Sequence, residues 1–372
     1  MKKYYLIVLI IAILLTGFSY GADSAEDEMI TERGKVIYVE EVEADGFLEG
    51  SLVTIEVLSG KYKGEQYTIN HYITGSFAYD LPVKPGDKVL LIVEEYEDNS
   101  VDIYIADYIR DTYVFSVIGI FMILLIIIGK KTGVKTLITL GITITLVMKL
   151  LLPGILKGYS PILLTVITSI LITFITIFII AGINTKSMSA IIGVMGGVVI
   201  AGLITFIVGS QVKLTGLSNE EATMLMYIPQ NIEFDFRGLL FSGIMLGALG
   251  AVMDVGISVA SAMEEIKRVS PHIKAKELIV SGMNVGKDIM GTMTNTLILA
   301  YTGSAIPLLL LFMAYETSII KIINLDIIAT EIIRAVAGTI GLILTIPITA
   351  FASGVMYEKF GNASKNKEDT IN

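Results

Sequence analysis

Long apolar stretches recur through the last two thirds of this chain and restrict its fold more than any other feature. The hydrocarbon core of a bilayer is about 30 Å thick, so a helix that crosses it needs roughly 20 mostly apolar residues. With 53% hydrophobic and 17% charged residues, the 372-residue chain is too apolar for an ordinary soluble protein. We therefore predict an α-helical polytopic membrane bundle over residues 112–358, with about seven transmembrane helices at 113–129, 133–152, 160–182, 187–209, 238–263, 287–313 and 331–357.

Residues 1–21 have the pattern of a secretory leader. Lys2 and Lys3 precede an apolar run at 4–15, and small residues follow at Ser19 and Gly21. This pattern predicts a signal peptide or an uncleaved signal anchor. In either case, we expect the segment that follows to be delivered outside the cytoplasm.

Residues 22–111 predict a small extracytoplasmic β-domain. Turn signals at Gly60, Gly64 and the Pro85-Gly86-Asp87 sequence separate short runs rich in Val, Ile, Tyr and Thr. Five such runs in one small domain indicate an OB-like barrel or a sandwich. The domain is acidic, which argues against nucleic acid as a partner. The expected strands are 35–42, 51–58, 65–73, 87–94 and 102–108.

Basic residues in the short connections predict the orientation, because cytoplasmic loops carry an excess of Lys and Arg. With the β-domain outside, thirteen basic residues fall on the cytoplasmic side and six on the outer side. This count agrees with the leader and predicts a multi-pass protein of the cell membrane with a cytoplasmic tail at 359–372. The thirteen are Lys2, Lys3, Lys130, Lys131, Lys135, Lys186, Lys267, Arg268, Lys274, Lys276, Lys359, Lys365 and Lys367, and the six are Lys149, Lys157, Lys213, Arg237, Lys321 and Arg334.

The composition argues against several kinds of chemistry. The chain has no Cys, and its two histidines, His71 and His272, are far apart in sequence, so we expect no metal centre. It has no Walker loop, dinucleotide-binding loop or nucleophile elbow. We therefore expect neither a cofactor nor an enzymatic activity.

The segment 238–263 carries an acidic residue where a membrane helix ordinarily carries none. Asp254 lies about sixteen residues into this apolar run, and Gly250, Ser258 and Ser261 share its helical face at spacings of four, four and three. A charge at mid-bilayer depth costs several kcal/mol, so such residues usually face a protein interior or a water-filled cavity. One interpretation is a role in ion, proton or substrate handling. The other is a structural residue that pairs with a helix donor and fixes packing.

The segment 281–303 carries a second polar stripe. One interpretation of its glycines, together with Asn284, Lys287 and Asp288, is a discontinuous or re-entrant start at 281–288, a recurring device in transporters. The alternative places 281–288 at the cytoplasmic interface, where Lys287 reaches water and Asp288 is solvated. The candidate residues of the stripe are Asn284, Lys287, Asp288, Thr292 and Asn295.

If the two stripes face each other, Asp254 and Asp288 would share an interior cavity with Lys287 as a counter-ion. Oxygen ligands there would suit a cation or a proton. The first hypothesis is therefore a permease or ion-coupled transporter of a small ion or metabolite, embedded in the lipid bilayer and able to form homo-oligomers. The second is a non-transporting scaffold or sensor that binds a partner through the outer β-domain. The surroundings of the two aspartates do not resemble the YD and GxGD motifs of intramembrane aspartyl proteases.

The sequence resembles the YibE/F family of bacterial multi-pass membrane proteins. The resemblance rests on GALGAVMDVGISVASAMEEI at 247–266, SGMNVGKDIMGTMTNTLILAYTGSAIPLLL at 281–310 and GLILTIPITAF at 341–351. In the outer domain it rests on VLSGKYKGEQYTI and VKPGDKVLL. Lys287 stands where the resemblance leads us to expect Arg, which keeps the positive charge. The resemblance implies a membrane location and a small N-terminal domain before seven or so helices, and it implies no mechanism.

Overall fold

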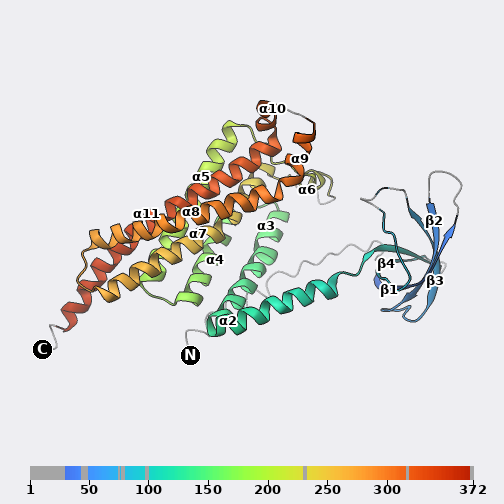
Figure 1. The fold of residues 1–372 in the computed structure, drawn as a ribbon, viewed down its shortest axis with the longest axis horizontal. Coiled ribbons are helices and arrows are strands. Elements are labelled where there is room, and N and C mark those ends of the chain that lie inside the picture. Colours follow the sequence, from blue (N-terminus) through green and yellow to red (C-terminus); the bar gives the residue numbers. More distant parts are fainter. Residues whose placement is uncertain are drawn as a thin grey trace. The chain divides into compact units, whose positions relative to one another are not determined.

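The computed structural model describes residues 30–42, 49–73, 76, 80–96, 100–228, 233–315 and 318–368. The predicted leader lies outside these residues. Contacts divide the chain into two compact units, one containing the β-domain and the other most of the helices (Figure 1).

The β-domain is a single antiparallel sheet of five strands in the order β3-β2-β1-β4-β5. The five predicted strands are confirmed, and all but β1 begin and end within two residues of the predicted limits. Alternate side chains turn inward to form the core of the sheet, with Val36, Val53, Ile55, Leu91 and Val93 fully buried. The strands are β1 (Ile30–Val42), β2 (Glu49–Val57), β3 (Gln66–Ile73), β4 (Lys88–Glu95) and β5 (Val101–Tyr108).

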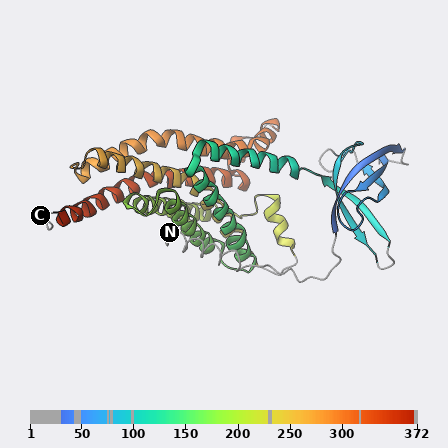
Figure 2. The same ribbon diagram turned by 90° about the horizontal axis from the view of Figure 1, so that it is seen from below.

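The second unit is a bundle of helices. In both views α7, α8 and α11 run side by side, and α5 packs against α7 and α11 (Figures 1 and 2). The connection between α5 and α7 contains one short α-helix, α6. The helices are α2 (Asp111–Leu146), α3 (Leu152–Leu156), α4 (Pro161–Ala181), α5 (Thr185–Gln211), α6 (Glu220–Met224), α7 (Phe236–Val269), α8 (Ala275–Ser304), α9 (Ile306–Ala314), α10 (Ile319–Ile323) and α11 (Asp326–Glu368), with a π-helical turn at Val147–Leu151.

Five helices in the described part of the chain are long and apolar enough to cross a membrane, or six if α8 and α9, bent by 60°, form one broken span. The first of the five runs from Asp111 to Leu156. Forty-six helical residues would reach about 69 Å, far more than a bilayer requires. The backbone leaves the helical conformation at Lys130, where φ is 47°. This break coincides with the predicted boundary between the first two segments, and seven crossings stay a prediction.

Candidate functional site

The predicted segment 238–263 lies within α7, which buries one side and leaves the other open. The helix begins at a cap, where the Asp235 carboxylate accepts a hydrogen bond from the Gly238 amide at 2.8 Å. The buried side includes Ala248, Val252, Val255, Val259 and Met263. The exposed side includes Gly243, Gly247, Gly250, Asp254 and Ser258.

Asp254 lies near the middle of α7, eighteen residues after Phe236 and fifteen before Val269. At 1.5 Å of rise per residue these separations are about 27 and 22 Å, so no end of the helix brings Asp254 close to bulk water. Ser261, the last residue of the predicted stripe, is half-buried.

Of the two alternatives for 281–288, the discontinuous start is not found, because α8 is helical without a break from Ala275 to Ser304. Its glycines serve close packing instead. A Cβ on Gly282 would lie 2.4 Å from the Met263 sulfur, and one on Gly286 would lie 2.1 Å from Ile346 Cγ2. The bend in this part of the chain falls at Ala305, between α8 and α9.

The polar stripe of α8 is exposed along its whole length. The Thr292 hydroxyl donates to the Ile289 carbonyl of its own helix at 2.9 Å. Among the residues that the structure describes, no hydrogen bond or ion pair involves the side chain of Asp254, Lys287 or Asp288. The exposed residues of this stripe are Asn284, Lys287, Asp288, Thr292 and Asn295.

The two stripes do not enclose the common interior cavity that we expected. The helices α7 and α8 are antiparallel neighbours, since Gly247 meets the Tyr301 hydroxyl and Gly282 meets Met263 (Figure 1). This register places Asp254 at about the depth of Gly291. The buried side of α7 packs against α5 and α11, and that of α8 packs against α7 and α11, so both polar stripes lie on the outside of the described bundle. The sequence pattern identifies a polar face but not what that face meets.

Comparison with known families agrees with these features. A family model described as YibE/F-like protein matches residues 117–359, which is more than half of the chain. The chain belongs to the YibE/F-like family. A second model, the YibE/F family N-terminal domain, matches residues 31–108 of the β-domain. No curated protein and no solved structure matched the YibE/F-like chain. The family match and the long apolar helices together identify a membrane protein.

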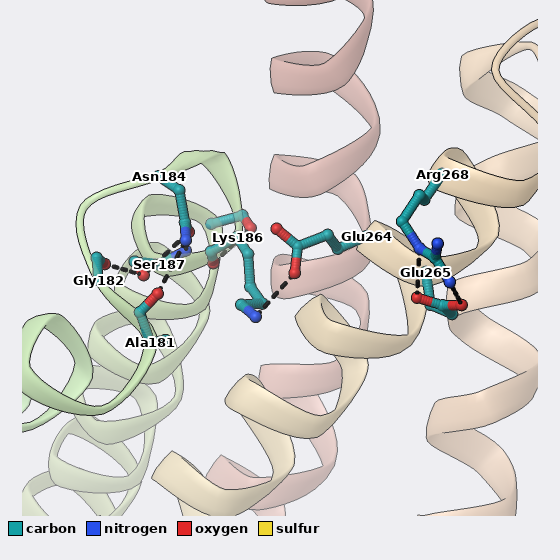
Figure 3. Close-up of polar contacts among 9 residues, drawn as sticks. Ala181, Gly182, Asn184, Lys186, Ser187, Glu264, Glu265 and Arg268 are labelled. Carbon is teal, nitrogen blue, oxygen red and sulfur yellow. Dashed lines mark hydrogen bonds and ion pairs between the residues drawn. The ribbon is translucent and has the colours of Figure 1, made fainter. Parts of the chain in front are cut away.

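In the YibE/F-like chain, an ion pair joins α5 to α7 at the end that we predict to be cytoplasmic. Lys186 Nζ lies 2.7 Å from Glu264 Oε2, and the two side chains are 20% and 38% exposed (Figure 3). Lys186 is held in place by the turn before it. Asn184 donates to the Ala181 carbonyl and accepts from the Ser187 amide, both at 2.8 Å. By contrast, the neighbouring Glu265 pairs with Arg268 on the same helix at 2.5 Å, with both side chains solvated.

A hollow of about 540 Å³ lies where α7 turns into α8. The Lys267 ammonium donates to the Pro271 and Ile273 carbonyls at 2.8 and 3.2 Å, which ties down the turn. The hollow does not reach Asp254, thirteen residues before Lys267. Its charged and aromatic lining residues are Lys267, His272, Lys274, Lys276, Tyr357 and Glu358.

Sequence reasoning missed two further polar groups. Arg334 and Glu331 form an ion pair at 3.0 Å on α11, and both lie near enough to Tyr301 to act on it electrostatically. Residues three apart are neighbours on a helix surface, so the spacing of Glu331 and Arg334 could have identified this pair from the sequence. The second group is the buried face of α4, whose hydroxyls have no hydrogen-bond partner within the described residues. It consists of Thr165, Thr168, Ser169 and Thr173, which share one helical face.

The β-domain presents tyrosines and acidic groups on its outer surface. Tyr96 donates to Glu94 at 3.2 Å, and this hydrogen bond raises the pKa of Tyr96 to about 12. Tyr104 lies beside Asp102, whose negative charge raises the pKa of that phenol. Arg33 on β1 pairs with Asp111, the first residue of α2. The sheet is thereby connected to the start of the first apolar helix by a charged contact as well as by the chain.

Proposed function

We propose that this protein is a permease or ion-coupled transporter, with Asp254 as its principal coupling carboxylate. The observation that supports the proposal best is the position of Asp254, near the middle of an apolar helix and without a partner among the described residues. A structural aspartate would be expected to pair with a donor of a neighbouring helix. An unpaired carboxylate is instead available to bind a proton or a cation.

The polar groups of α7 and α8 suit a small cation or a proton better than a large anion. Carboxylate, hydroxyl and amide oxygens are ligands for hard cations, and a membrane carboxylate also exchanges protons. Ser258 and Ser261 would support Asp254 on α7. On α8, Asp288 would supply a second carboxylate, with Asn284, Thr292 and Asn295 as oxygen donors and Lys287 as the counter-charge.

A flux assay in sealed vesicles tests this proposal. Uptake and efflux of small cations and metabolites would be screened with the reconstituted wild type and then with Asp254→Asn. We expect Asp254→Asn to reduce flux to that of protein-free vesicles, because an amide side chain neither ionises nor takes up a proton near neutral pH. Glu265→Gln is the matched control, since it makes the same change on the same helix at a solvated position. Wild-type flux in Asp254→Asn would overturn the proposal.

The second candidate function is a membrane scaffold or sensor that binds a partner through the β-domain. The exposed tyrosines favour it, because Tyr is enriched at protein interfaces. The contact between Arg33 and Asp111 would connect such a surface to the first apolar helix. Phenotypes confined to Tyr96→Ala and Tyr104→Ala, with Asp254→Asn silent, would favour this function over transport.

The proposal also includes the fold of the β-domain and the orientation of the chain in the membrane. The strand order, together with the approach of β3 to β5, supports an OB-like barrel. The distribution of Lys and Arg supports a β-domain outside the cytoplasm and a cytoplasmic C-terminus. Protease added to intact cells would cleave the β-domain and spare the tail in this orientation.

A further inference from the structure

Four glycines of α7 and α8 have open space in front of them. A Cβ placed on Gly243, Gly250, Gly291 or Gly303 would meet no described atom within 4 Å beyond its own neighbours along the helix. The described glycines of α5 and α11 are closely packed by contrast, whereas Gly141 of α2 is open like those of α7 and α8. A Cβ on Gly197 of α5 would lie 1.9 Å from the Thr345 hydroxyl, and one on Gly341 of α11 would lie 2.6 Å from the Gly197 carbonyl oxygen.

Small residues in membrane helices are typical of positions where another helix approaches closely. In α5 and α11 the glycines meet such a neighbour within the chain. The open glycines of α7 and α8 likewise leave room for a close helix, but they meet no neighbour within the described residues. They therefore indicate a helix-packing surface whose second half is not supplied by this part of the chain.

The same exposed sides of α7 and α8 carry three charged residues within the predicted membrane segments 238–263 and 287–313. Asp254, Lys287 and Asp288 are exposed, and among the described residues none of them is paired. Leaving such charges in contact with lipid costs several kcal/mol each, and an apolar partner would offer no counter-charge. The occupant of this surface must therefore supply both signs of charge, and it must fit closely against glycine.

We propose that a second copy of this chain covers the exposed sides of α7 and α8. A symmetric dimer brings the same surface of two subunits together, so the surface must be complementary to itself. This surface meets that condition, because the Lys287 ammonium of one copy can pair with Asp254 or Asp288 of the other. In one respect the inference rests on the proposed function, since the transport path would then run between two copies.

The absence of natural cysteines allows a direct test by cross-linking in native membranes. Gly250→Cys and Gly291→Cys each introduce one thiol where the structure leaves room for a side chain. Val199→Cys is the matched control. It is 42% exposed on α5, and the packing of Gly197 against Val252 places it at about the same depth as Gly250. Each variant would be treated with an oxidant and with a short bis-maleimide, and covalent dimers would be measured on denaturing gels.

We expect covalent dimers from Gly250→Cys and Gly291→Cys, and monomers from Val199→Cys. Equal yields from all three variants would mean random collision and would overturn the proposal. So would monomers throughout, which would be the result if lipid or another segment of the chain covered the surface.

The mass of the purified wild type in lipid nanodiscs provides a second measurement that does not depend on a cysteine variant. We expect two chains per particle, and one chain after Lys287→Glu, which leaves the surface with acidic charges alone. A monomeric wild type, or a Lys287→Glu variant that stays fully dimeric, would contradict the pairing. Neither readout involves transport, so a failed dimer and a failed transporter are distinguishable.

Discussion

Gly286 of α8 lies so close to Ile346 of α11 that a Cβ on the glycine would stand 2.1 Å from the isoleucine Cγ2. Five residues along the same helix, Gly291 faces open space. The two glycines therefore have different roles, although the sequence alone presents them alike.

Gly286→Ala should destabilise the bundle. Forcing an extra methyl group into a packed core typically costs about 1–3 kcal/mol, because side chains and backbone must shift. Gly291→Ala should leave the stability of the single-chain fold unchanged or raise it slightly, since alanine favours a helix and meets no neighbour within the described chain. Thermal unfolding of the purified variants in detergent would measure both. Equal losses from the two substitutions would contradict the packing of α8 against α11.

The ion pair between Lys186 and Glu264 should contribute measurably to stability. It is partly shielded from water, whereas the pair between Arg268 and Glu265 is solvated and lies within one helix. A double-mutant cycle with Lys186→Ala and Glu264→Ala should give a coupling energy of about 0.5–1 kcal/mol, near the upper end for exposed pairs. The corresponding cycle for Arg268 and Glu265 should give a coupling near zero. A larger value for the solvated pair would show that burial is not what distinguishes them.

In the β-domain, the Lys61 ammonium contacts both carboxylate oxygens of Glu95, at 3.0 and 2.9 Å. These hydrogen bonds lower the pKa of Glu95 below the usual glutamate value of 4.5. Because the folded-state pKa is the lower one, this stabilisation is present above pH 4.5 and is lost as the pH falls through the folded-state value. In Lys61→Ala, the pKa of Glu95 should return upward. Carboxyl carbon NMR during an acid titration would detect the change, and an unchanged midpoint would contradict the contact.

The sequence predicted the elements well where one physical constraint dominates. Strands such as β3 were located because alternate residues face the core, and the helices because a bilayer sets the length of an apolar run. The polar faces of α7 and α8 were predictable from spacings of three and four residues. These patterns depend only on neighbours along the chain.

What the sequence did not predict is which surfaces meet. The spacing of Gly250, Asp254 and Ser258 defines a face, but it does not say whether that face meets α5, lipid or another molecule. From the sequence, Gly282 and Gly286 could equally have marked a break or a continuous helix; in the structure they allow Met263 and Ile346 to approach α8 closely. The pairing of Lys186 with Glu264 joins residues far apart in the sequence, and each alone resembles an ordinary solvated charge.

The central claim is that the exposed side of α7 contacts water or polar groups and does not face lipid. Ser258→Cys tests it against Ile192→Cys on α5, which is 45% exposed and lies at a similar depth because Gly256 packs against Val194. Thiols react as thiolates, which form only where water reaches. In native membranes, a charged thiol reagent should therefore label Ser258→Cys and leave Ile192→Cys unlabelled. If Ser258→Cys is as unreactive as Ile192→Cys, while both react after denaturation, the exposed side of α7 faces lipid and the account is contradicted.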